Sequence, residues 1–319
     1  MGNHKENINP KVTFNDVAFN TSGISLAKPS DFFALMKPRV MSLVVFTAWA
    51  GLVLAPGSMP LWNAFASILC IAAGAGASGA LNMWYDADID PHMRRTKNRP
   101  VPQGHISARG ALVFGLLIAV FGSSLFFLVH WKAAFWSFFS VAFYVFIYSI
   151  WLKRRTPQNI VIGGIAGATP PLIGWAAAAS TSIDSLNPFD LGSPIPWVFF
   201  MLIFFWTPPH FWALALYRVD EYRKSGLPML PVTHGIDFTC LQILLYTLIL
   251  LAACLMPFVY GMSSWLYLLV ALGLSLVFVV HAFKLWRQYS DEQARHTFKF
   301  SLVHLSVLFA AMLVDHYLF

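Results

Sequence analysis

Charge is what this 319-residue sequence has least of. Only 11% of its residues are Asp, Glu, Lys or Arg, whereas 58% are hydrophobic. A water-soluble protein of this length carries about a quarter charged residues. A chain with so little charge does not cover a water-facing surface. The composition therefore excludes a soluble globular protein and indicates that lipid surrounds most of the molecule.

Cysteine is also scarce. Cys70, Cys240 and Cys254 are odd in number, each lies inside an apolar segment, and no CxxC pair occurs. This pattern excludes a disulfide framework and gives no zinc site. We expect the three thiols to be small packing residues.

Apolar runs, in contrast, are abundant. Several reach the roughly 20 residues that cross a hydrocarbon core. They predict an all-α polytopic membrane protein, because backbone groups in lipid must be satisfied within their own helix. We expect residues 1–35 to form a polar, flexible arm and residues 36–319 the membrane domain. The nine predicted spans are residues 36–55, 62–85, 109–130, 133–152, 160–180, 197–217, 238–260, 264–284 and 297–318.

Lys and Arg are almost absent from alternate loops. One side of the predicted membrane domain has only Lys132, and the loop 180–196 holds Asp184 and Asp190 without any basic residue. The positive-inside rule then places the N-terminus in the cytoplasm and the C-terminus outside. Because the net charge of +7 follows this topology, we do not expect nucleic acid as a partner.

The strongest local motif lies at the end of the second span. Asn82, Asp86 and Asp90 are spaced four apart, so they share one helical face. Pro91 predicts that the helix ends at Asp90. Like charges on one face repel. A Mg²⁺ ion, which takes oxygen ligands and commonly joins protein carboxylates to substrate phosphates, resolves the conflict.

Basic residues follow this acidic motif directly: Arg94, Arg95, Lys97 and Arg99. Carboxylates that hold a metal, beside cations that bind phosphate oxygens, suit a metal-bound diphosphate. The alternative is a solvated, salt-bridged loop. That reading accounts for the basic residues but not for an Asn and two Asp on one face.

A second, weaker motif follows the sixth span, with Asp220, Glu221 and Lys224. It comes four spans after the first, so both face the same side of the membrane, which suggests an internal duplication. We expect Asp220 or Glu221 to be a further metal ligand, with the choice open, and Lys224 to bind diphosphate. The alternative is an ordinary charged loop.

Small residues are dense at residues 74–80 and 163–168. Such stretches let helix backbones approach closely in lipid. They also leave room for a large ligand in a central intramembrane cavity, and the sequence leaves both readings open.

Four stretches carry a resemblance to a known family. They are Asp86-Ala87-Asp88-Ile89-Asp90 with Arg95-Thr96 and Arg99-Pro100 after it, residues 156–164 with Pro170-Pro171, residues 208–215, and residues 226–232. Together they resemble the protohaem IX farnesyltransferases (haem O synthases), which are UbiA-type intramembrane prenyltransferases. The resemblance covers about residues 37–319. Where that family has Asp-Tyr, this sequence has Glu221-Tyr222, which leaves open which acid serves.

The resemblance implies that farnesyl diphosphate and haem b are the substrates. The farnesyl group would join a haem vinyl group with addition of water, giving haem O for terminal oxidases. Mg²⁺ would be the cofactor, and Asp86, Asp90, Arg95 and Arg99 would be the catalytic residues. A bacterial inner membrane location, an active site that faces the cytoplasm, and a haem A synthase or terminal oxidase assembly as partner would follow.

The same reading needs residues that bind haem. His210 lies within a span behind Pro208 and Pro209, and ionisable residues at membrane depth are functional candidates. Imidazole is a common axial ligand of haem iron, so we expect His210 to bind haem. Its competitors are His281 and His304, and the alternative is a histidine bonded to backbone that the prolines leave free. Cations for the haem propionates would come from Lys37, Arg39 and residues 153–155, with Lys153 among them.

Three rival functions remain at this point. One is a related prenyltransferase that acts on a quinone precursor or another aromatic acceptor. A second is a transporter, but the carboxylates here lie at cytoplasmic span ends and not at the bilayer midplane that transporters use. The third is a membrane anchor without chemistry, for which the same-face carboxylates would be an unexplained cost.

Overall fold

The computed structural model describes residues 27–179 and 185–319, and this part of the chain is helical without any strand. Eight of its helices or continuous helix pairs are long and apolar enough to cross a membrane, or nine if the bent pair α1 and α2 counts as one span. The predicted all-α polytopic fold is thereby confirmed. The predicted arm lies outside the described residues as far as residue 26, and its last part forms helix α1.

The described residues form helical elements joined by connections of varied length. In chain order they are α1 (Pro29–Leu35), α2 (Pro38–Val53), α3 (Leu61–Tyr85), η1 (Asp90–His92), α4 (Ala108–Leu125), η2 (Phe126–Leu128), α5 (Trp131–Ala142), η3 (Phe143–Leu152), α6 (Asn159–Ala168), α7 (Pro170–Ala178), α8 (Ile195–Leu216), α9 (Val219–Lys224), α10 (Leu230–Thr233), α11 (Ile236–Val259), α12 (Trp265–Arg287) and α13 (Asp291–Leu318).

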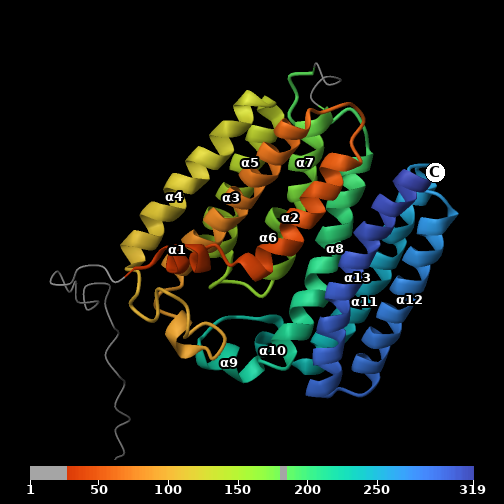
Figure 1. The fold of residues 1–319 in the computed structure, drawn as a ribbon. Coiled ribbons are helices and arrows are strands. Elements are labelled where there is room, and N and C mark those ends of the chain that lie inside the picture. The colour runs from red at the N-terminus through yellow and green to blue at the C-terminus, as the bar shows by residue number, and fades with distance from the viewer. Residues whose placement is uncertain (1–26, 180–184) are drawn as a thin grey trace, which may run out of the picture.

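Figure 1 shows the long helices in two groups, with α2 to α7 on one side and α8, α11, α12 and α13 on the other. The contacts agree, since α3 packs on α4, α2 on α7, and α11 on both α8 and α12. The short helices α9 and α10 lie at one end of the bundle, beside the segment that follows α3 (Figure 1). That end carries both acidic motifs.

The first span differs from its prediction because it is broken. α1 and α2 meet at an angle of 57°, and Lys37 between them has φ 52° and ψ 55°. This left-handed conformation is unfavourable for a residue with a side chain and costs roughly 1–2 kcal/mol. Pro38 favours the break, because a residue that precedes proline is disfavoured in the right-handed helical region.

The fourth span contains an unusual helix. η3 continues α5 as a π-helix over Phe143–Leu152, and at its end the Lys153 amide donates to the Tyr148 carbonyl at 2.8 Å. In an α-helix a residue five positions on lies about 140° further round the axis. The i→i+5 bond instead stacks Lys153 close to Tyr148. Both residues therefore face the same side of the helix. Short π-helical segments occur frequently at functional sites.

Candidate active site

The predicted central cavity is present. It has a volume of about 270 Å³ and lies between α2, α3, α5, η3, α6, α7 and α8. Both small-residue stretches contribute to its wall, through Gly74 and Ala75 on α3 and Gly163, Gly164 and Gly167 on α6. These residues leave space because they have almost no side chain.

Another glycine of the α3 stretch, Gly79, allows α3 to pack closely against the chain between α1 and α2. A Cβ atom on Gly79 would lie 3.1 Å from the Leu35 carbonyl oxygen and 3.5 Å from Lys37 Cδ. Glycine at this position lets the break between α1 and α2 approach α3, which brings Lys37 to the acidic motif. Both readings of the small residues therefore hold, each at its own positions.

Helix α3 ends at Tyr85, not at Asp90 as Pro91 predicted, and Asp86 is its C-cap residue. Negative side chains are unfavourable at the C-terminus of a helix, where the backbone already carries negative partial charge, and the α-helix stops before the acidic residues. The chain still makes one further turn, because the Asp90 amide donates to the Asp86 carbonyl at 2.8 Å. Asp90 thus lies one turn beyond Asp86.

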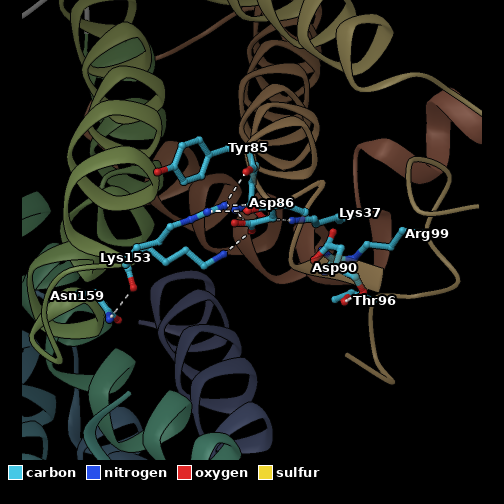
Figure 2. A network of polar contacts seen from close by, with 11 residues as sticks. Lys37, Tyr85, Asp86, Asp90, Thr96, Arg99, Lys153 and Asn159 are labelled. Carbon is cyan, nitrogen blue, oxygen red and sulfur yellow. Dashed lines mark hydrogen bonds and ion pairs between the residues drawn. The ribbon is translucent and has the colours of Figure 1, made fainter. Parts of the chain in front are cut away.

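The motif residues are buried and bonded to each other. Asn82, Asp86 and Asp90 are 5%, 2% and 3% exposed. Asn82 Nδ2 donates to Asp86 Oδ2 at 2.7 Å. Two lysines from distant segments complete the group: Lys37 Nζ donates to Asn82 Oδ1 at 2.6 Å, and Lys153 Nζ forms an ion pair with Asp86 Oδ2 (Figure 2).

Asp90 has partners of its own. Arg99 Nη1 lies 2.8 Å from Asp90 Oδ2, and the Thr96 hydroxyl donates to the Asp90 carbonyl at 2.7 Å. Figure 2 shows Arg99 reaching Asp90 from the loop after the motif. Of the predicted phosphate-binding residues in the described chain, Arg99 is thus the one cation that contacts a motif carboxylate, whereas Asn82, also expected to bind diphosphate, contacts Asp86 through its amide.

Asp88 turns away from this group. Its side chain is 64% exposed and lies 2.7 Å from Arg154 Nη2. Partial burial by itself raises the pKa of Asp88, but the hydrogen bonds and charge of Arg154 outweigh it, and the pKa lies below its ordinary value. Arg154 also donates to the Tyr85 carbonyl at 2.9 Å. The Asp88–Arg154 pair therefore ties the end of η3 to the end of α3.

The donor set fits a hard cation. Asp86 Oδ1 is buried and has no hydrogen-bond partner among the described residues, and the other side-chain acceptors of the group are oxygens. No cluster of three His, Cys, Asp or Glu residues suitable for a metal occurs in the described ranges. The residues therefore suit an ion such as Mg²⁺, which is commonly held by one or two carboxylates and completed by phosphate oxygens and water.

The second acidic motif stays apart. On α9, Asp220 pairs with Arg223 at 2.9 Å and Glu221 with Arg218 at 3.2 Å, and no hydrogen bond or ion pair within the described residues joins either acid to Asp86 or Asp90. The two motifs are nevertheless neighbours, because Ile89 and Met93 share an apolar cluster with Tyr222 and Leu227. Glu221 is the less exposed of the two acids, at 24% of its side chain against 77% for Asp220.

The remaining predicted cations are solvent-exposed. None of them forms an ion pair with a residue that the structure describes; they are Arg39, Arg94, Arg95, Lys97 and Lys224. Lys153, which we expected at a haem propionate, lies instead at Asp86.

His210 contacts a side chain and not the backbone freed by Pro208 and Pro209. Its Nδ1 lies 2.6 Å from the hydroxyl oxygen of Ser301 on α13. Its ring stacks on Trp206 with centroids 4.1 Å apart and on Phe298 at 4.7 Å. The competitors also bridge helices: His281 Nδ1 lies 3.1 Å from Gln293, and His304 Nε2 lies 3.3 Å from Ser275.

Sequence reasoning missed Tyr144 and Tyr148, which line the cavity from η3. Their spacing to Lys153 gave no signal, because an α-helical reading places Lys153 on another face. It also missed that Lys37 and Lys153 contact the acidic motif, since the topology rule already accounted for every basic residue.

Gly163→Ala is expected to destabilise the protein by about 1–3 kcal/mol, the usual cost of overpacking. A Cβ at this position would lie well inside van der Waals contact of the Tyr148 ring, whereas one at Gly167 would meet nothing within 4 Å. Thermal unfolding in detergent measures the effect, with Gly167→Ala as the matched control. Equal melting temperatures for the two variants would contradict this packing.

Comparison with known proteins gives one family. The model of the UbiA prenyltransferase family matches residues 43–306. A protoheme IX farnesyltransferase of Acidovorax sp. (strain JS42) is 52% identical over 297 residues, which cover 91% of this chain and 93% of that protein.

Solved structures show the same fold. An apo UbiA homologue from Aeropyrum pernix K1 matches with a TM-score of 0.72 at 19% identity, over 87% of this chain and 98% of that one. A UbiA homologue from Archaeoglobus fulgidus, bound to DMAPP and Mg²⁺, matches with a TM-score of 0.63 at 16% identity, over 89% and 99%.

Proposed function

This chain belongs to the UbiA prenyltransferase family, and we infer that it transfers the farnesyl group of farnesyl diphosphate to a vinyl group of haem b, with addition of water, to make haem O. The geometric observation that carries this function is a buried carboxylate near an apolar cavity, with one oxygen that has no partner among the residues the structure describes. Ser78 of α3 lines that cavity, and Asn82 and Asp86 follow one and two turns further along the chain. The 52% identity with a protoheme IX farnesyltransferase supports haem as the acceptor.

Mg²⁺ would be held by Asp86 and Asp90, with Asn82 and one of Glu221 and Asp220 as further ligands. When bound, it neutralises the diphosphate and makes it a better leaving group. Asp86 Oδ1, which has no hydrogen-bond partner in the described ranges, supports this assignment, and a UbiA homologue of the same fold is bound to DMAPP and Mg²⁺.

The cations of the site now contact the acidic motif, and we expect them also to bind the diphosphate. Lys37, Lys153 and Arg99 all reach the buried polar group that contains Asp86 and Asp90, so its cations outnumber its carboxylates. We propose that Lys37 and Lys153 exchange their present partners for phosphate oxygens when the diphosphate binds. There they stabilise the negative charge that grows as the C1–O bond breaks. Arg95, Arg94, Lys97 and Lys224 would bind the outer phosphate oxygens.

The cavity serves the hydrocarbon part of the reaction. Its apolar wall holds the farnesyl chain and excludes bulk water, so the allylic cation is protected until the haem vinyl group attacks it. The alternative acceptor is a quinone precursor. The test supplies the reconstituted protein with Mg²⁺, farnesyl diphosphate and equal amounts of haem b and 4-hydroxybenzoate. We expect farnesyl on haem alone; farnesyl on the benzoate alone would favour the alternative.

We propose that His210 binds haem iron through Nε2, since Ser301 engages Nδ1. His210→Ala is then expected to shift the absorption spectrum of bound haem and to weaken haem binding, measured by titration of the purified protein. His281→Ala is the matched control on another helix. An unchanged spectrum and affinity in His210→Ala would exclude this role, and a shift in His281→Ala alone would transfer it to His281.

The end of the bundle with both motifs would face the cytoplasm of a bacterial inner membrane. The distribution of Lys and Arg supports this orientation. A haem A synthase or a terminal oxidase assembly would receive the product.

A further inference from the structure

Two hydroxyl groups in the cavity wall have no hydrogen-bond partner in the part of the chain that the structure describes. They belong to Tyr144 and Tyr148 of η3, both of which line the cavity. The other hydroxyl groups of the wall are engaged. Their bonds are Ser78 to the Gly74 carbonyl at 3.1 Å, Ser137 to Ser123 at 2.8 Å, Ser140 to the Ala166 carbonyl at 3.2 Å, and Thr207 to the Ile203 carbonyl at 2.7 Å.

The π-helix sets the order of these groups. Lys153, which contacts Asp86, stacks one π-turn beyond Tyr148 through the bond between its amide and the Tyr148 carbonyl. Tyr144 lies one turn on the other side of Tyr148, and the two rings are 5.2 Å apart. From the acidic motif into the cavity the sequence of polar groups is therefore Lys153, Tyr148 and Tyr144. Gly163 makes room for the Tyr148 ring.

The reaction needs one ordered water inside this apolar space, a requirement that rests on the proposed function. A buried water is held by roughly two to four polar partners. The other wall hydroxyls already take part in hydrogen bonds, whereas those of Tyr144 and Tyr148 still have both a donor and acceptors free among the described residues. We propose that the hydroxyl groups of Tyr144 and Tyr148 bind the water molecule that ends the reaction.

The step balances without any redox partner. The C1–O bond of farnesyl diphosphate breaks and the electron pair leaves with the diphosphate. The π pair of the haem vinyl group forms the new C–C bond, which leaves a cation on the vinyl carbon next to the ring. The bound water forms the C–O bond to that carbon. Its proton passes through the Tyr148 hydroxyl to the departing diphosphate.

Without a bound water the same cation has another outcome. It loses a proton from the adjacent methylene group, which was the terminal carbon of the vinyl group, and a double bond forms instead of the alcohol. The two products differ by one water. Their ratio therefore reports how well water is held, independently of how fast the farnesyl group is transferred.

The test compares Tyr144→Phe, Tyr148→Phe and the double variant, which keep the rings and remove only the hydroxyl groups. Each protein is incubated with haem b, farnesyl diphosphate and Mg²⁺, and the haems are analysed by mass spectrometry. The ratio of hydroxylated to dehydrated product is expected to fall about tenfold for each hydroxyl removed. The control is Tyr246→Phe, whose ring packs on Trp212 of α8 outside the cavity wall, and its ratio is expected to match wild type.

An unchanged ratio in the double variant overturns the proposal while the haem O synthase function stands. Loss of both products in a double variant that still unfolds cooperatively also overturns it, because the hydroxyls would then act before the water step. If wild-type protein itself leaves haem b unmodified, the proposed function falls and this inference falls with it.

Discussion

Asp86→Asn is expected to reduce the rate of farnesyl transfer about a thousandfold or more. Asp86 is 2% exposed. Its Oδ2 accepts from Asn82 and pairs with Lys153, and its Oδ1 has no partner in the described chain. The asparagine keeps the size of the side chain but removes the charge that would hold Mg²⁺. Loss of one preorganised electrostatic contact to a developing charge already costs about 10²–10³ in rate, and loss of the metal adds to this.

Asp88→Asn is the matched control for this variant. It removes the same charge two residues along, from a side chain that is 64% exposed and paired with Arg154. An exposed ion pair contributes about 0–1 kcal/mol, so we expect activity within about tenfold of wild type. Steady-state rates with haem b and farnesyl diphosphate give the comparison. Similar losses in Asp86→Asn and Asp88→Asn would show that the buried carboxylate has no special role.

Lys153→Met is expected to lower kcat/KM for farnesyl diphosphate about a hundredfold. The variant keeps most of the apolar stem but removes the ammonium group, which would pass from Asp86 to a phosphate oxygen. Charge-assisted hydrogen bonds to phosphate are about twice as strong as neutral ones, and this one strengthens as the leaving group gains charge. The loss is therefore expected in kcat as well as in KM.

Arg155→Met is the corresponding control, because Arg155 is exposed and lies two residues beyond Lys153. We expect its kinetic constants to stay within about threefold of wild type, as for an exposed charge outside the site. Should Lys153→Met retain the wild-type KM and kcat, the exchange of Lys153 from carboxylate to phosphate would be excluded.

Most of the fold followed from apolar run length. The predicted span 62–85 became α3 at Leu61–Tyr85, and the predicted span 197–217 became α8 at Ile195–Leu216. Such agreement is expected where lipid requires each helix to satisfy its own backbone. The last helix begins earlier than predicted, at Asp291, because Ser290 caps it by accepting from the Gln293 amide.

The acidic motif could be found from spacing alone, but its partners could not. Lys37 lies 45 residues before Asn82, and Lys153 lies 67 residues after Asp86. Only the tertiary fold brings these residues together. Their charge also satisfied the topology rule, which left no unexplained signal in the sequence.

The π-helical geometry of η3 could not be predicted from the sequence, for a different reason. Hydrophobic periodicity assumes about 3.6 residues per turn, and the residues from Phe143 to Leu152 are apolar on almost every side. A uniformly apolar helix gives no pattern from which a π-helix can be read. The placement of Tyr148 beside Lys153 therefore needed the structure.

One measurement tests the central claim most directly. Liposomes that contain the wild-type protein or the Asp86→Asn variant are incubated with haem b, farnesyl diphosphate and Mg²⁺, with and without a chelator. The haems are then extracted and their masses are measured by mass spectrometry. We predict a haem heavier by one farnesyl group plus water with the wild-type protein and free Mg²⁺, and only traces otherwise. Unmodified haem b from a folded wild-type protein, or the same yield of product in the presence of chelator, would contradict the account.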